Sequence, residues 1–393
     1  MLETSTDVLI VGAGPVGMAL AITLAEQGLR PMLVDRALTH QTTSRAAVIH
    51  AHTLDILDRI GIAGPMKAEG LQIQNFAFRD RDRMLGTFRF DRLPSRHNYL
   101  LMLPQDRTEA IMLTRLAELG VDVVRGATFT TLREEIDHVV VDLQTPEGVT
   151  KVSATYVVGA DGIHSEVRKA CGIAFDGDQY EGSFILADIT VEGAQNRDEV
   201  SLFFSPAGLV VVAPLPGGRL RIVATVDDAP EKPDASLIQS LLQARGPTAP
   251  KLGKVLDVHW SSRFRLHHRL ARSYSKGRVF IAGDAAHAHS PAGGQGMNTG
   301  IGDAYTLGRL LGRVIVGQAD RASLDSYEVL RRPAAAEVLR LAGRMTSAAT
   351  MRSPLKRAVR NLVLSAMARL PAVRERVELS LSGIARASAT VSE

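Results

Sequence analysis

The chain has 393 residues, of which 45% are hydrophobic and 22% are charged, a composition typical of a globular protein with one large or two closely joined domains. Its single cysteine, Cys171, cannot form a disulfide within the chain, and no segment approaches the roughly 20 apolar residues of a membrane-spanning helix. A strand-like run already begins at Asp7, so we expect no signal peptide and a cytoplasmic location. The net charge of +4 gives little indication of a nucleic-acid partner.

A strand–helix–strand unit is predicted at the beginning of the chain. Residues 7–11 (DVLIV) and 31–35 (PMLVD) have the pattern of buried strands, and residues 15–28 have that of the helix between them. Such a unit implies a parallel sheet. A second helix, with apolar residues between Ala47 and Ile60, precedes extended segments at 71–79 and 84–90.

The middle of the chain is predicted to form two different sheets. A helix at 105–119 precedes strands at 121–125, 138–143 and 149–158, the last of which returns the chain to the first sheet. A separate, mostly antiparallel sheet is indicated by a run of strands at 183–191, 199–204, 208–214, 219–225 and 255–265. A buried strand at 278–282, a glycine-rich loop at 283–296 and several helices complete the chain.

The glycine-rich turn after the first strand predicts a dinucleotide site. Gly12-Ala13-Gly14-Pro15-Val16-Gly17 joins that strand to the helix, so its glycines permit a tight turn and close backbone approach. The helix N-terminus would then face a pyrophosphate. Asp35 ends the second strand, 23 residues after Gly12, where an acidic residue accepts hydrogen bonds from the ribose of an unphosphorylated adenosine.

Two further motifs follow predicted strands. Residues 160–168 read ADGIHSEVR, and residues 283–287 read GDAAH, with PAGGQGMN following at 291–298. With these motifs, in this order, the chain resembles the group A flavoprotein monooxygenases, the family of p-hydroxybenzoate hydroxylase and phenol hydroxylase. The resemblance extends from the glycine motif to Tyr327-Glu328 and Arg331-Arg332-Pro333.

The resemblance implies an α/β fold in which a mostly antiparallel sheet is inserted into a Rossmann-like domain. The discontinuous FAD-binding domain is then expected at residues 1–70, 98–180 and 267–340. The substrate domain is expected at 71–97 and 181–266, and a C-terminal helical tail at 341–393. The chain resembles the short form of the family, without a C-terminal thioredoxin-like domain, and we expect a monomer or a homodimer.

The resemblance also implies tightly but non-covalently bound FAD. Gly12, Gly14 and Gly17, with Pro15 and Val16 beside them, would hold the pyrophosphate. The other residues implied in cofactor binding are Asp35 and its neighbour Arg36 at the ribose, Arg45 beside the flavin, Gln105 near the ribityl chain or pyrophosphate, Asp161, Gly283, and Asp284 at the ribityl chain. For Asp161, a local role as helix cap is compatible with binding.

The loop before the long helix at about 297–316 is the expected catalytic region. Its backbone N–H groups and the positive helix end could face N1 and O2 of the flavin, where the reduced ring is anionic. Gly294, Gly296, Met297 and Asn298 are therefore expected to bind the cofactor. Pro291, Gly293 and Gly294 are expected catalytic residues because they leave space over the ring for dioxygen. Arg45 is the fourth expected catalytic residue, because the resemblance places it beside the flavin.

The reaction implied by the resemblance is hydroxylation of a phenolic or fused-ring aromatic substrate. NADH or NADPH would reduce FAD, and O2 would form a C4a-hydroperoxyflavin. No second Gly-x-Gly-x-x-Gly unit is present, which fits transient binding of the nicotinamide. The group that activates the substrate hydroxyl stays open among Tyr180, Arg221, His259 and Arg263.

Other functions are possible on the same motifs. A flavin epoxidase and an antibiotic-inactivating oxygenase would share the oxygenating chemistry, and a non-catalytic binding protein would share only the fold. A halogenase is disfavoured because Trp260 is the sole tryptophan and the expected Trp-x-Trp motif is missing. The sequence predicts no metal site, because the His267-His268 pair, His287 and His289 lack ligand companions at metal spacing.

The C-terminal tail is basic and amphipathic. Residues 340–393 hold 10 Lys/Arg against 3 Asp/Glu. Apolar residues recur at helical spacing at Leu355, Val359, Leu362, Val363, Ala366 and Leu370. We expect a helix that buries this stripe against its own domain, as the resemblance implies packing over the FAD domain. A membrane-surface or partner-binding helix is the less favoured alternative.

Overall fold

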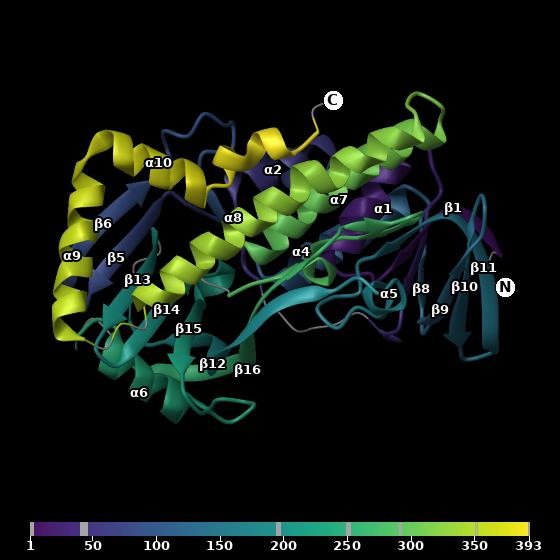
Figure 1. The fold of residues 1–393 in the computed structure, drawn as a ribbon. Helices are drawn as coiled ribbons and strands as arrows, with labels where there is room; N and C mark the ends of the chain where they lie inside the picture. Colours follow the sequence, from purple (N-terminus) through teal and green to yellow (C-terminus); the bar gives the residue numbers. More distant parts are fainter. Residues whose placement is uncertain are drawn as a thin grey trace.

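The computed structural model describes residues 4–39, 46–193, 198–248, 253–290, 293–349, 351 and 353–391, with backbone only at 179–182 and 265–266. Two large sheets lie at opposite ends of an elongated molecule, and a long helix, α8 (Ser326–Ala349), runs diagonally across it (Figure 1). The N-terminus lies at the end formed by the first sheet. The α/β class expected from the sequence is confirmed.

The first sheet is built around the predicted strand–helix–strand unit. Strand β1 pairs in parallel with β2 on one side and β11 on the other, and β11 pairs in parallel with β18. Its strands are β1 (Ser5–Val11), β2 (Met32–Asp35), β8 (Val123–Arg125), β9 (Thr128–Glu134), β10 (Val139–Thr145), β11 (Gly148–Gly159), β17 (Ser275–Lys276) and β18 (Val279–Ile281). The sequence patterns predicted most of these strands but neither β9 nor the two-residue strand β17.

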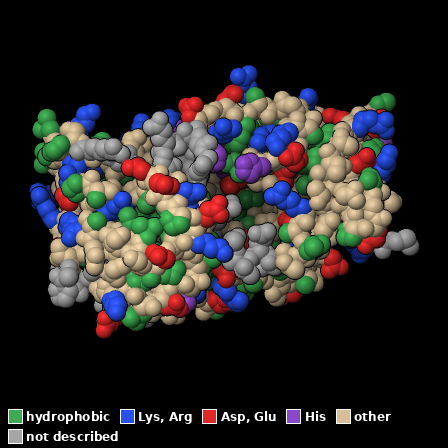
Figure 2. Space-filling view, turned by 90° about the horizontal axis from the view of Figure 1, so that it is seen from below, with side chains coloured by type: hydrophobic (Ala, Val, Ile, Leu, Met, Phe, Trp, Pro, Cys, Tyr) green, Lys and Arg blue, Asp and Glu red, His purple; other side chains and the backbone are tan. Residues whose placement is uncertain are grey.

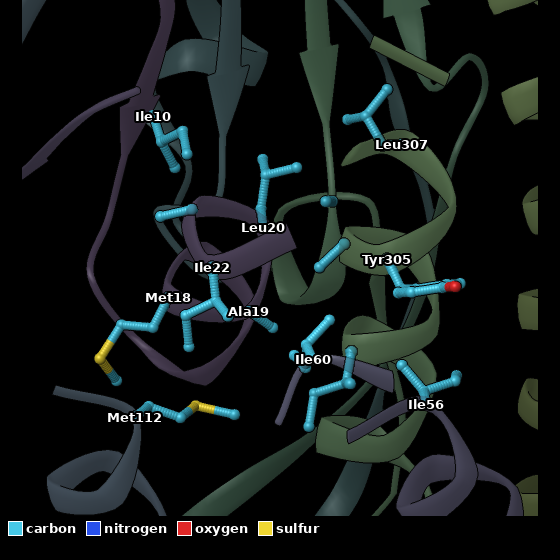
Figure 3. Close-up of a cluster of buried hydrophobic side chains, with 14 of the residues drawn as sticks. Ile10, Met18, Ala19, Leu20, Ile22, Ile56, Ile60, Met112, Tyr305 and Leu307 are labelled. Carbon is cyan, nitrogen blue, oxygen red and sulfur yellow. The ribbon is translucent and has the colours of Figure 1, made fainter. Parts of the chain in front are cut away.

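Helix α1 (Pro15–Ala25) lies against α4 (Gln105–Glu118) and α7 (Gly296–Ile315). It is apolar on all sides, so it is buried nearly throughout. Met18, Leu20 and Ile22 of α1 pack with side chains from the surrounding helices, among them Met112 and Leu307 (Figure 3). This core fixes the N-terminus of α1 beside the ends of β1 and β11.

A small sheet and two helices connect the first sheet to the second. Strand β7 (Leu100–Met102) pairs antiparallel with β3 (Val48–Ile49) and β4 (Leu71–Ile73). Helices α2 (Ala51–Arg59) and α3 (Ala63–Glu69) lie between β3 and β4 in the chain.

The second sheet has eight strands and is antiparallel except for the parallel pair of β5 and β13. In spatial order they are β19 (His287–Ala288), β16 (Val255–Ala271), β12 (Phe175–Val191), β15 (Leu220–Val226), β14 (Gly208–Pro214), β13 (Glu199–Ser205), β5 (Asn75–Asp80) and β6 (Arg83–Arg89). Helix α6 (Ala235–Arg245), which the sequence analysis did not predict, packs against this sheet. The prediction of a mostly antiparallel sheet is confirmed.

The chain ends in short helices after α8. These are α9 (Pro354–Arg369), α10 (Pro371–Leu381) and the 3-10 segment η4 (Ile384–Ala389); shorter elements elsewhere are α5 (Glu166–Ala170), η1 (Pro216–Gly218), η2 (Gly283–Ala285) and η3 (Arg321–Asp325). Among the described residues, no helix is both long and apolar enough to cross a membrane.

The prediction for the tail helix is wrong in its orientation. The apolar stripe that was expected to be buried faces solvent, with Leu355 75% and Leu362 71% exposed. The opposite face of α9 packs against β6 of the second sheet, where Ala368 meets Gly86, rather than over the first sheet. Periodicity revealed an apolar face, but it could not show which face the neighbouring strand would cover.

Candidate cofactor site

The glycine turn lies between the carboxyl ends of β2 and β11. The Gly12 N–H donates to Val34 O at 2.8 Å, and the Ala160 N–H donates to Val11 O at 2.8 Å. A Cβ on Gly12 would lie 2.4 Å from Ala160 O, and a Cβ on Gly17 would lie 1.9 Å from Gly12 O. Around Gly14 a Cβ would meet nothing within 4 Å, so the outer side of the turn is open to a close-approaching group.

The Asp35 carboxylate lies at the open turn. Its Oδ2 accepts a hydrogen bond from the Ala13 N–H at 2.7 Å, and its Oδ1 accepts one from the Ala37 N–H at 2.8 Å. Each carboxylate oxygen keeps further acceptor capacity, so ribose hydroxyls can still donate to it. The adjacent Arg36 is exposed, and Arg125, which the sequence analysis missed, lies 4.0 Å from Asp35 across the β2–β8 pair.

Asp161 follows β11, next to the glycine turn. Its Oδ2 accepts hydrogen bonds from the Glu166 and Val167 N–H groups at 2.8 and 3.3 Å, which is the helix-capping role considered from the sequence. Its Oδ1 is buried and has no hydrogen-bond partner among the described residues. Burial raises the pKa of this carboxyl group above its ordinary value. Asp161 thus offers an acceptor that no described residue satisfies.

The turn at Gly283–Ala285 (η2) lies beside the N-terminus of α1. A Cβ on Gly283 would lie 2.8 Å from Val16, and one on Gly300 of α7 would lie 2.5 Å from the same side chain. The two glycines therefore allow η2, α1 and α7 to meet at Val16. Asp284 is exposed at this junction.

A buried charged network, not identified from the sequence, holds η2 against α7 and α8. Asp303 accepts hydrogen bonds from His287 Nε2 at 2.6 Å, from Arg331 Nε at 2.8 Å and from the Gly283 N–H at 3.1 Å. His287, Asp303 and Arg331 are each at most 4% exposed. Although burial opposes it, the facing His287 and Arg331 lower the pKa of Asp303. We call this set the Asp303 network.

The loop before α7 is fixed to the beginning of α2. Asn298 Oδ1 accepts from the His50 N–H at 2.8 Å, while its Nδ2 donates to Val48 O and Gly294 O at 2.9 and 2.8 Å. His50 Nε2 donates to Gly293 O at 2.9 Å, and His50 Nδ1 is buried with no partner among the described residues. The N–H groups of Gly296 and Met297 stand in the first turn of α7, where a helix has no internal acceptors for them.

The tail also contacts this loop. Arg386 of η4 donates to Gln295 Oε1 at 3.0 Å, and Gln295 Nε2 donates to Leu381 O at 3.0 Å. Arg331 of the Asp303 network donates to Ala389 O at 3.1 Å. The last helical turns of the chain therefore support the loop between Gly293 and Asn298.

Several predicted residues lie away from this constellation or outside the description. Arg45 and Pro291 are outside the described residues, as is the side chain of Tyr180. Gln105 Oε1 accepts from the Ala46 N–H at 3.1 Å, so it holds the residue that follows Arg45. Among the candidates for substrate activation, Arg221 is paired with Asp188 at 2.7 Å, His259 bonds Thr190 at 2.8 Å, and Arg263 lies 3.4 Å from Asp228.

The arrangement fits FAD. The open turn at Gly14 and the first turn of α1 suit a pyrophosphate, and Asp35 suits a ribose. Asp161 Oδ1, which follows β11, and His50 Nδ1, beside the loop before α7, are buried polar atoms with no partner among the described residues. Figure 2 shows the surface hollowed near the middle of the molecule, with histidine and basic side chains at the rim. In the described part of the chain, no cluster of His, Cys, Asp and Glu could hold a metal ion.

Two buried histidines predict loss of stability in mild acid. Burial lowers the pKa of both His50 and His289 from 6.5 to about 4. Between pH 6.5 and 4 the unfolded chain takes up protons that the folded protein does not bind, so acidification favours unfolding. Thermal unfolding across this range should give a midpoint that falls as pH falls. The slope should be smaller in His50→Gln than in the wild type; equal slopes in the two proteins would contradict the assignment.

The geometry defines a dinucleotide-binding flavoprotein, with a Rossmann-type turn and a helix N-terminus that completes the site.

Comparison with known proteins leads to the same class of protein. A family model described as FAD binding domain matches residues 5–342. The 6-methylpretetramide 4-monooxygenase of Streptomyces rimosus is 35% identical over 389 residues, which cover 96% of this chain and 69% of that protein. Pentachlorophenol 4-monooxygenase of Sphingobium chlorophenolicum is 31% identical over 340 residues, which cover 84% of this chain and 63% of that protein.

Solved structures share the fold. A p-nitrophenol 4-monooxygenase from Pseudomonas putida DLL-E4 superimposes with a TM-score of 0.89 at 24% identity, covering 98% of this chain and 99% of that chain. The anhydrotetracycline hydroxylase OxyS from Streptomyces rimosus gives a TM-score of 0.80 at 33% identity, and the match covers 96% of this chain and 76% of that chain. The chain belongs to the FAD-binding family of flavin-dependent aromatic monooxygenases, and the resemblance drawn from its motifs is confirmed.

Proposed function

We propose that this monooxygenase uses NADH or NADPH and O2 to hydroxylate a phenolic or fused-ring aromatic substrate. The observation that carries the proposal is the convergence of the Gly12–Gly17 turn, the η2 turn and the α7 N-terminus on one site. Relatives named pentachlorophenol 4-monooxygenase and 6-methylpretetramide 4-monooxygenase support an aromatic substrate. The cytoplasm stays the expected location, and a monomer or homodimer the expected assembly.

The cofactor-binding roles follow from the geometry. Gly12, Gly14 and Gly17, with the first turn of α1 at Pro15 and Val16, would hold the pyrophosphate, because a Cβ at two of these glycines has no room. The other proposed contacts are Asp35 at the ribose with Arg36 beside it, Gln105, Asp161, and Asp284 with Gly283 at the ribityl chain.

The loop before α7 would serve the reacting end of the cofactor. Bound FAD supplies the electron transfer and the reaction with O2. The N–H groups in the first turn of α7 would stabilise negative charge on the flavin ring, since they are preorganised and need no rearrangement. Asn298 would hold Gly294 in place through its bond to the Gly294 carbonyl. Arg45 and Pro291 remain proposed here on the sequence resemblance alone.

The domain division is also proposed. Residues 1–70, 98–180 and 267–340 would bind FAD, and residues 71–97 and 181–266 would supply the substrate-facing sheet. The division is supported by strands β5 and β6, which join β12–β16 in the second sheet although they lie far away in sequence. Residues 341–393 would pack against both the FAD-binding part and the substrate-facing sheet.

Asp284→Ala should reduce FAD occupancy without unfolding the protein. The carboxylate is exposed beside the α1 N-terminus, so its loss removes an acceptor for ribityl hydroxyls while core packing is unchanged. We expect the dissociation constant for FAD to rise about tenfold, measured by flavin fluorescence during titration. Asp325→Ala, in η3, is the control; the role of Asp284 would be rejected if both variants bound FAD like the wild type.

The proposed function is tested by following NADH and NADPH oxidation in the FAD-loaded protein with a panel of phenols and fused-ring aromatics. A true substrate should accelerate oxidation and yield an oxygenated product by mass spectrometry. If a compound accelerates oxidation but only hydrogen peroxide forms, it is an effector and not the substrate. The proposal fails if no member of either class is oxygenated while the reduced protein still consumes O2.

A further inference from the structure

The outward face of α9 is apolar and exposed. Leu355, Val359, Leu362, Val363 and Leu370 are 75%, 54%, 71%, 48% and 55% exposed. At about 100° per residue, the four of these residues that lie within α9, together with Ala366, fall within one face of the helix that is about 100° wide, and Leu370 follows directly at its C-terminal end. We call this set the α9 stripe. A contiguous exposed apolar surface on a folded protein marks an interaction site more often than scattered exposed residues do.

The opposite face of α9 is anchored, so the stripe cannot turn inward. The Arg360 guanidinium lies 4.7 Å above the Phe204 ring and donates to Ala348 O at 3.0 Å. Asn361 Nδ2 donates to Asp80 Oδ2 at 2.8 Å, and Ala368 packs against Gly86 so closely that a Cβ on the glycine would lie 2.6 Å away. These contacts fix the rotation of α9 about its own axis.

Basic residues flank the α9 stripe. Between Pro354 and Arg369 the helix has four basic residues and no acidic one. Lys356 projects from one border of the stripe and Arg369 from the other, and both are exposed. Hydrophobic and basic side chains stand together at the left-hand end of Figure 2, the end that α9 forms in Figure 1.

The basic residues beside the α9 stripe indicate what kind of partner binds this face. Two copies of the chain that joined through their α9 stripes would bring basic residues against basic residues, with no acidic residue in the helix to compensate. An anionic bilayer fits both the apolar α9 stripe and the basic residues beside it. Its phosphate groups attract the basic residues, and the boundary of its acyl chains buries the leucines.

We infer that α9 docks on the surface of an anionic lipid bilayer. The α9 stripe lies at the boundary between head groups and acyl chains, and Lys356 and Arg369 lie at the level of the phosphates. The contact is peripheral. The inference depends on the exposed face and its charges and is independent of the substrate proposed above.

The experiment uses the full chain loaded with FAD, sedimented with vesicles of phosphatidylcholine alone or of phosphatidylcholine with an equal share of phosphatidylglycerol. We expect binding to the anionic vesicles, weak binding to the neutral ones, and release by about 1 M NaCl, where the Debye length falls to about 3 Å. Binding that is equal for both lipid compositions at low salt would overturn the electrostatic part of the inference.

Variants locate the contact. Leu355→Ser/Leu362→Ser and Lys356→Glu/Arg369→Glu should each lower the partition coefficient by about tenfold or more. The matched control is Val329→Ser/Leu256→Ser, which replaces two residues that are 71% and 59% exposed away from α9 and should bind like the wild type. FAD content and the thermal midpoint, which these exposed positions should leave unchanged, show that each variant is folded.

Three results would overturn the inference. One is failure of the wild type to bind anionic vesicles at low salt. Another is binding by the Leu355→Ser/Leu362→Ser variant that equals that of the wild type. The third is a wild-type dimer, seen by light scattering, that this variant dissociates while vesicle binding is absent, because that result assigns the face to a second copy.

Discussion

Replacing Gly294 with alanine should lower turnover by about a hundredfold while FAD remains bound. Gly294 has φ +62°, and a Cβ there would lie 2.0 Å from Cγ1 of Val48, a stiff β-branched side chain on β3. The loop must therefore shift, and with it the first turn of α7 that we propose to face the flavin ring. The pyrophosphate turn at Gly12–Gly17 is distant in sequence and retains its geometry. Turnover is measured as product formed per bound FAD.

Two comparisons separate crowding from backbone strain. Gly293→Ala places alanine at φ +86° with no heavy atom nearer than 3.5 Å, so it imposes the strain without the clash. It should lower turnover much less than Gly294→Ala does. Adding Val48→Ala to Gly294→Ala should restore part of the activity relative to Val48→Ala alone. Equal losses in both glycine variants, with no rescue, would contradict the steric explanation.

Replacing Asp303 with asparagine should destabilise the protein by about 3–5 kcal/mol, because the change leaves the Arg331 charge buried without its counter-ion. The Gly283 N–H and His287 also lose a charged acceptor, so η2 should loosen and FAD affinity should fall. Thermal and urea unfolding of the FAD-free protein measure the first effect, and flavin titration measures the second.

The chain supplies a matched control for this change. Asp228 also pairs with an arginine, Arg263 at 3.4 Å, but its side chain is 96% exposed. Asp228→Asn should change stability by less than about 1 kcal/mol, since exposed ion pairs contribute little. Asp303→Asn combined with Arg331→Gln should recover part of the loss by removing both charges. If the buried and exposed pairs gave equal effects, the Asp303 network would not be the support for η2 that we describe.

Local patterns predicted the parts of the site that are contiguous in sequence. The Gly12–Gly17 turn and Asp35 could be placed because one strand, one helix and the next strand fix them. The Asp303 network could not, because His287, Asp303 and Arg331 come from a loop and two helices that meet only in the folded chain. The same holds for His50, which reaches Gly293 across 243 residues.

The errors in the fold have equally specific causes. Strand β9 is missing from the prediction because most of its side chains are exposed or half-buried, which leaves weak alternation. Helix α6 is missing because the segment between the predicted strands at 219–225 and 255–265 was given no regular structure, although Asp234 caps its first turn by accepting from the Leu237 N–H at 2.8 Å. For α9, the stripe was found correctly but assigned to the wrong side.

The most direct test of the central claim is incorporation of isotopically labelled dioxygen. The FAD-loaded protein, NADH or NADPH and an aromatic compound that accelerates oxidation are incubated under labelled O2 in ordinary water, and the product is analysed by mass spectrometry. We predict that the product carries one labelled oxygen atom on the ring. A product whose new oxygen comes from water, or oxidation that gives only labelled hydrogen peroxide with every compound tested, would contradict the assignment as a monooxygenase.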